Sequence, residues 1–147
     1  MKKALFGAAL IICIMLVTAC QTSGNSAGQI DDARFRSVYD RYRSGLILDG
    51  AGTYTVRSGD TLVNISRSFY QDGLYYPIIM LASSDVVLDP DLINPGMRLT
   101  IPDLQVNFNN ANARANIKAF FYDMADLEES RGRSPTANGI RQHANSL

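Results

Sequence analysis

The side chains that most often carry out catalysis are sparse in this sequence. His143 is the only histidine, and it lies in a polar C-terminal segment without a neighbouring carboxylate, so its side chain is expected to be solvated. Asp89 and Asp91 lie two residues apart in a turn-rich loop, where aspartates more often accept hydrogen bonds from backbone N–H groups than act as an acid–base pair. The turn at Gly59 lacks the lysine of a phosphate-binding loop. We therefore expect a protein that is not an enzyme and uses no metal ion or cofactor.

Cysteine chemistry is confined to the N-terminal head. Lys2 and Lys3 precede an uncharged run of sixteen residues, 4–19, which is short for a membrane span and suited to a signal peptide. The run leads into "VTAC", which resembles the lipobox of bacterial lipoproteins. This resemblance implies that Cys20 is lipidated and begins the mature chain. Residues 1–19 are thus expected to be a signal peptide and residues 20–30 a lipidated Cys with a flexible tether; the alternatives are an ordinary signal peptide or an uncleaved anchor.

The charge of the mature chain gives no reason to expect a nucleic acid partner. Removal of Lys2 and Lys3 leaves twelve basic side chains against fourteen acidic ones. The arginines are dispersed among carboxylates, which is typical of a solvated surface with ion pairs.

A strand and a helix meet at a polar corner in the middle of the chain. Residues 53–57 alternate apolar and polar side chains, as a strand does, and residues 62–69 carry apolar side chains at helical spacing. The apolar positions of that helix are Leu62, Ile65 and Phe69. Between the two segments, Gly59 supplies a turn and Asp60 is expected to cap the helix N-terminus.

A second helix and a second strand follow within fifty residues. Pro77 suits the start of a helix that ends near residue 83, the Pro-Gly pair in residues 94–96 predicts a turn, and residues 98–101 alternate as a strand. The stretches "YTVRSGDTL" and "DPDLINPGMRLTIP" resemble the LysM domain, a small carbohydrate-binding module. The resemblance implies an α+β fold over residues 53–103: a βααβ module with two antiparallel strands and both helices on one face.

The segments on either side of this module are expected to be helical. Residues 31–52 comprise an amphipathic helix to about residue 44 and an extended lead-in. Within the extension 104–147, a helix is predicted over 109–131, followed by a short helix from residue 137. A module of fifty residues buries little surface alone, so these helices are expected to enlarge its core; the alternative is a surface for a protein partner.

The LysM resemblance also implies a shallow groove for polymers that contain N-acetylglucosamine. One wall would consist of Gly59, Asp60, Thr61 and Leu62. The other wall would consist of Ser83, Asp85, Val86, Val87 and Leu88. Val87 is expected to face Thr61 from an exposed loop. Ser83 departs from the asparagine that is usual in the family, and this puts the affinity in doubt rather than the fold.

Together these features predict a non-catalytic lipoprotein that tethers a membrane to peptidoglycan. Its expected place is the bacterial cell envelope, facing the periplasm, with the outer membrane favoured because Gln21 follows Cys20. The alternative is an envelope scaffold that recruits a cell-wall enzyme or a division protein through its helical flanks.

Overall fold

The computed structural model describes residues 26–147. The predicted signal peptide and Cys20 lie outside these residues. Within them, no helix combines the length and the apolar character needed to cross a membrane.

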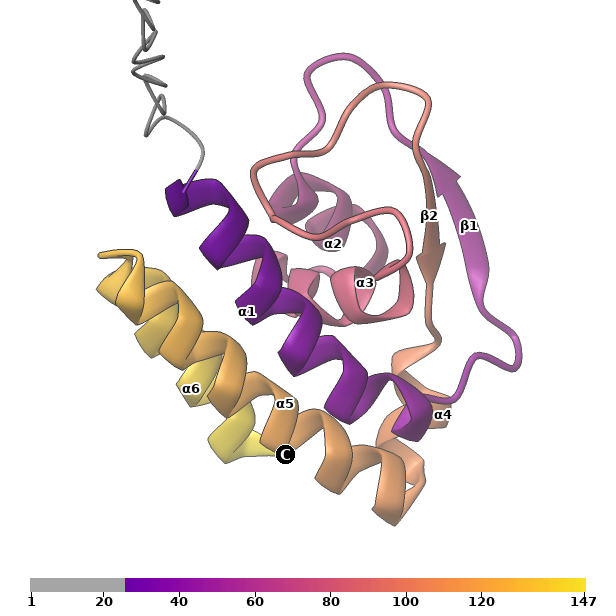
Figure 1. The fold of residues 1–147 in the computed structure, drawn as a ribbon. Helices are drawn as coiled ribbons and strands as arrows, with labels where there is room; N and C mark the ends of the chain where they lie inside the picture. Colours follow the sequence, from indigo (N-terminus) through magenta and orange to yellow (C-terminus); the bar gives the residue numbers. More distant parts are fainter. Residues whose placement is uncertain (1–25) are drawn as a thin grey trace, which may run out of the picture.

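The predicted βααβ unit is confirmed. Strand β1 (Gly52–Thr55) pairs antiparallel with β2 (Arg98–Ile101), and the register places Tyr54 opposite Leu99. Between the strands lie α2 (Leu62–Tyr70), the short 3-10 helix η2 (Gly73–Tyr75) and α3 (Tyr76–Ala82). Both α-helices lie on the same side of the sheet (Figure 1).

Helix α2 buries most of the apolar face that the sequence predicted. Leu62 and Ile65 enter the core, but Phe69 is 45% exposed and packs edge-on against the Tyr54 ring. Ser66 is also buried, and its hydroxyl donates to the Asp72 carbonyl at 2.7 Å. The C-terminal end of the apolar face therefore lies at the surface.

Helix α1 (Ser26–Tyr42) confirms the predicted N-terminal helix but begins at Ser26 rather than at Asp31. It buries Phe35, Val38 and Tyr39, and the Tyr39 hydroxyl donates to the Leu88 carbonyl at 3.0 Å. A 3-10 turn, η1 (Arg43–Gly45), ends the helix. The helix is thus joined to the loop that follows α3.

The C-terminal extension forms three helices where the sequence predicted two. Helix α4 (Leu104–Asn109) begins after Asp103, whose carboxylate accepts from two backbone N–H groups. Helix α5 (Ala111–Ser130) begins after Asn110, whose side-chain oxygen also accepts from two backbone N–H groups. Helix α6 (Ser134–Ser146) returns along α5 after a turn at Gly132. Helix α4 was not predicted from the sequence, although Asp103 and Asn110 are both favourable capping residues.

The flanking helices share one core with the βααβ unit. The buried residues of α5 include Ile117, Phe120, Phe121 and Met124. Phe121 packs against Tyr75 of η2 and Phe120 packs against Tyr42 of α1. Helix α5 lies between α1 and α6, and all three cover the unit on the side away from β1 (Figure 1). The apolar face of α5 therefore completes the core.

Candidate functional site

At the corner between β1 and α2, Asp60 stabilises the turn and the next residue caps the helix. Gly59 adopts a φ of +86°, which explains the glycine. The Asp60 carboxylate accepts from the Tyr54 hydroxyl at 2.7 Å and from the Arg57 N–H at 2.8 Å. The Arg57 N–H and then the Tyr54 hydroxyl hold the pKa of Asp60 below its ordinary value.

Thr61, rather than Asp60, caps α2. Its hydroxyl oxygen accepts from the Asn64 N–H at 3.2 Å. The prediction that Asp60 is the cap was therefore wrong by one residue, because the hydrogen bonds within the turn occupy its carboxylate.

Thr61→Ala is expected to lower the free energy of unfolding by about 1 kcal/mol, the usual cost of a lost N-cap. Thr61→Ser keeps the capping oxygen and should unfold close to the parent in a urea titration. Equal losses in both variants would show that the hydroxyl contributes through something other than the cap.

The predicted second wall is divided between surface and interior. Asp85 and Val86 are exposed and Leu88 is half-buried, whereas Ser83 and Val87 are buried. The Ser83 hydroxyl oxygen accepts from the Thr100 N–H at 2.8 Å and so joins the end of α3 to β2. The expectation of an exposed Val87 was wrong, since its side chain belongs to the hydrophobic core.

A cavity of about 390 Å³ lies beside the corner. Residues 60–63 form one side, including the predicted residues Asp60, Thr61 and Leu62, and Pro90, Asp91 and Ile93 form the second. Its remaining lining residues are Tyr76, Glu128, Arg133 and Thr136.

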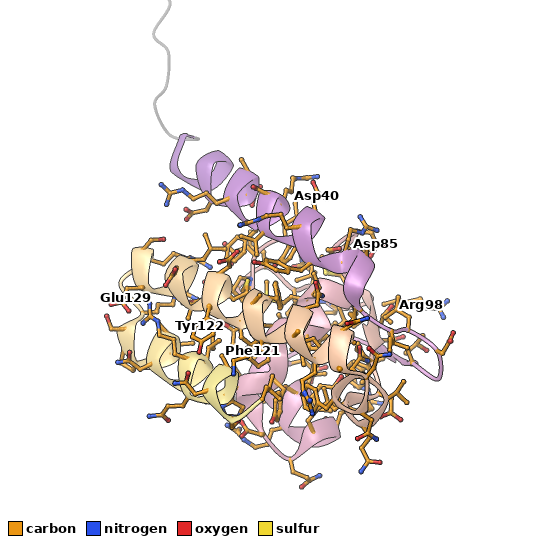
Figure 2. All side chains as sticks on the ribbon, turned by 90° about the horizontal axis from the view of Figure 1, so that it is seen from below. Asp40, Asp85, Arg98, Phe121, Tyr122 and Glu129 are labelled. Carbon is orange, nitrogen blue, oxygen red and sulfur yellow. The ribbon has the colours of Figure 1, made fainter. Side chains whose placement is uncertain are left out.

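The predicted second wall does not contribute to this cavity. Asp85 and Leu88 border a smaller hollow of about 200 Å³ beside α1, and Asp40 also lines this hollow. Figure 2 labels Asp40 and Asp85. Three of the four residues of the first predicted wall line the cavity, and Gly59 does not; the other lining residues include some from beyond the βααβ unit. The role of each predicted residue in binding stays a prediction.

Arginines from the α5–α6 turn hold the loop at residues 89–91. One nitrogen of the Arg131 guanidinium lies 2.8 Å from an Asp89 oxygen and 3.1 Å from an Asp91 oxygen. Arg133 pairs with Asp91 and reaches Glu128 at 3.4 Å. Asp89 also accepts from the Asp91 N–H at 2.8 Å, which confirms its predicted turn role. The sequence did not indicate the ion pairs with Asp89 and Asp91, because the partners are about forty residues apart.

Ion pairing and burial shift the pKa values of two of these carboxylates, Asp91 and Glu128, in opposite directions. The Arg133 guanidinium lowers the pKa of Asp91 by hydrogen bonding. Burial raises the pKa of Glu128, and its neighbours Arg133 and Arg131 offset that rise only in part. Its side chain is sealed from solvent by the cluster.

Glu128→Gln is expected to change how stability depends on pH. The folded pKa of Glu128 lies above its ordinary value of 4.5, so folding takes up protons at this residue. Its stabilising contribution is complete below the unfolded pKa and is lost as pH rises through the folded pKa. The melting temperature of the parent minus that of the variant should therefore fall as pH rises from the ordinary glutamate pKa of 4.5 through the higher folded pKa. A difference that grows with pH would mean that ion pairing outweighs burial.

His143 has a carboxylate partner that the sequence did not reveal. Its Nε2 lies 2.8 Å from an Asp72 oxygen, its Nδ1 lies 3.2 Å from the Gly139 carbonyl, and its ring packs edge-on against Tyr75. Burial alone would raise the pKa of Asp72. Hydrogen bonds from the Leu74 N–H and from His143 outweigh that effect, so the pKa is lowered. The expectation of a solvated histidine was wrong: the pair holds α6 against η2. Among residues 26–147, no three His, Cys, Asp or Glu side chains group as a metal site would require.

Comparison with known proteins assigns the central unit to a class. Residues 54–102 match the LysM domain family, and the observed βααβ fold agrees with that match. This part of the chain is a LysM domain, a module that binds glycans such as peptidoglycan and does not itself catalyse reactions.

The curated relatives are similar over part of the chain. The chain is 37% identical over 67 residues to the potassium binding protein Kbp of Escherichia coli O6:H1, a match that covers 46% of this chain and 45% of that protein. It is 41% identical over 58 residues to an esterase of Mycobacterium tuberculosis, covering 40% of this chain and 12% of the esterase. An uncharacterized protein of Deinococcus radiodurans is 42% identical over 53 residues, which are 36% of this chain and 20% of that protein. The chain thus spans less than half the length of these relatives, and no solved structure matches it significantly.

Proposed function

We propose that the protein is a non-catalytic lipoprotein of the bacterial cell envelope that binds peptidoglycan through its LysM domain. The observation that carries the binding is the LysM match over residues 54–102, together with a fold that places an open cavity beside the Gly59–Leu62 corner. The cavity combines apolar and polar lining, as a site for an N-acetylated sugar requires.

The membrane anchor in this proposal is the lipid on Cys20. Its support is the "VTAC" pattern at the end of an apolar run, which follows Lys2 and Lys3. A protein held in this way from the outer membrane, facing the periplasm, could tether that membrane to the wall. The potassium binding named for one relative and the esterase activity named for another are left out, because each match covers less than half of either protein.

A scaffold that recruits a protein through its helical flanks has less support. An exposed apolar patch on the helix at 109–131 would favour that alternative. The apolar face of α5 is instead buried, and among the large hydrophobic side chains of α5 only Tyr122 is exposed.

Two experiments test the two parts separately. The chain from residue 21 onward, without lipid, should co-sediment with purified peptidoglycan sacculi, and oligomers of N-acetylglucosamine should release it. A protein that stays in the supernatant at all concentrations would rule out the binding. The full precursor should fractionate with membranes, and Cys20→Ser should abolish this; a variant that stays membrane-bound would rule out the lipid anchor.

A further inference from the structure

Residues outside the LysM domain also line the cavity beside the corner. Arg133 and Thr136 come from the start of α6, and Glu128 from the end of α5. The ion pair of Arg131 with Asp89 fixes this turn against the domain; both side chains are largely buried, so the contact is better shielded than a surface pair. The third side of the cavity therefore has a defined position.

Two of the three carboxylates that line the cavity are paired with arginines. Asp91 is paired with Arg131 and Arg133, and Glu128 is paired with Arg133. The partners of Asp60 are the Tyr54 hydroxyl and the Arg57 N–H, which carry no charge. An anionic ligand would meet three carboxylates around one guanidinium. The lining thus disfavours anionic groups.

The rest of the lining suits an uncharged sugar ring. Leu62, Val63, Pro90 and Ile93 are apolar, and the hydroxyls of Thr61 and Thr136 can each donate or accept. Arg133 is partly exposed and can donate to a hydroxyl or an amide carbonyl. A volume of about 390 Å³ lies within the usual range of small-molecule sites.

Building on the proposed glycan binding, we propose that the α5–α6 turn is part of the sugar site. Arg133 and Thr136 form a third wall that contacts an uncharged, N-acetylated sugar ring seated between Thr61 and Ile93. The LysM domain therefore acts together with its C-terminal helices in binding, and the cavity excludes sugars that carry a carboxylate.

Thr136→Trp tests the third wall from outside the LysM domain. The probe is the tetramer of N-acetylglucosamine, measured by calorimetry on residues 21–147. The tryptophan fills the cavity, so binding should weaken by at least about tenfold, or about 1.4 kcal/mol. Gln142→Trp, an exposed position on the same helix, is the matched control and should bind as the parent does.

The outcomes separate this inference from the proposed function. If the parent and Thr136→Trp bind the tetramer equally, the third wall is overturned while glycan binding stands; if the parent itself does not bind, both fall. Should Thr136→Trp melt well below the parent, Thr136→Gln replaces it, because Gln suits the third position of a helix and still extends into the cavity. A weaker tetramer affinity in that variant supports the third wall, and an unchanged affinity overturns it.

The exclusion of carboxylates is tested with a tetrasaccharide of alternating N-acetylglucosamine and N-acetylmuramic acid. Its affinity should be lower than that of the uncharged tetramer at low salt, and the gap should narrow as salt rises. Equal affinities, or tighter binding of the carboxylated sugar, would overturn the assignment to an uncharged ring.

Discussion

Val87→Asp is expected to unfold the protein. The Val87 side chain is 0% exposed and lies in the core, so the aspartate would be an unpaired charge without water. Burial of such a charge costs several kcal/mol, whereas the total stability of a domain is about 5–15 kcal/mol. We expect a large fall in the melting temperature or no cooperative transition at all, and binding should be lost with the fold.

Val86→Asp is the matched control for this change. Val86 is the preceding residue and is 41% exposed, so its charge remains solvated. Its melting curve should stay close to that of the parent, as is usual for surface substitutions. If the two variants melt alike, Val87 is not in the interior.

Phe121→Ala is expected to destabilise the whole chain, including the LysM domain. Phe121 is fully buried on α5, and its ring centroid lies 6.2 Å from that of Tyr75, which belongs to the LysM domain. Truncation of a buried phenylalanine costs about 3–5 kcal/mol through lost burial and the cavity that remains. Circular dichroism and tyrosine fluorescence should report the same lowered transition.

Tyr122→Ala is the comparison for this variant. Tyr122 follows Phe121 on α5, where Figure 2 labels both residues. Tyr122 is 37% exposed, so a smaller loss is expected. Two separate transitions in the Phe121→Ala variant, with the LysM transition unchanged, would show that the C-terminal helices fold independently of the domain.

The sequence predicted those elements of the fold whose formation depends on local sequence patterns. Alternation at residues 53–57 and 98–101, with a turn between proline and glycine at residues 94–96, indicated two strands, and both are present. The helical spacing of Phe35, Val38 and Tyr39 indicated α1 and its buried face. Such periodicity reports which side of an element meets the core.

What the sequence did not predict depends on contacts between distant segments. The loop that carries Val87 looked like surface, but α1 covers it through the bond from Tyr39 to Leu88, 49 positions away in sequence. The partner of His143 is 71 positions away, and the partner of Arg131 is 42 positions away. The third side of the candidate site was missed for the same reason. The choice between Asp60 and Thr61 as the cap was local, but it depended on the Tyr54 hydroxyl, whose direction the pattern does not give.

The packing of α1 on α5 has a consequence for the order in which the chain can fold. Tyr42 bonds to Asp123 at 2.8 Å across a sequence separation of 81. A chain that is exported N-terminus first, as the proposed signal peptide implies, presents α1 before α5. The LysM strands and helices can pair in the interval, when the face of α1 that carries Phe35 and Tyr39 still lacks its partner Phe120 on α5. Closure of the core is therefore a late event, and a chain halted before α5 leaves these aromatic side chains uncovered on that side.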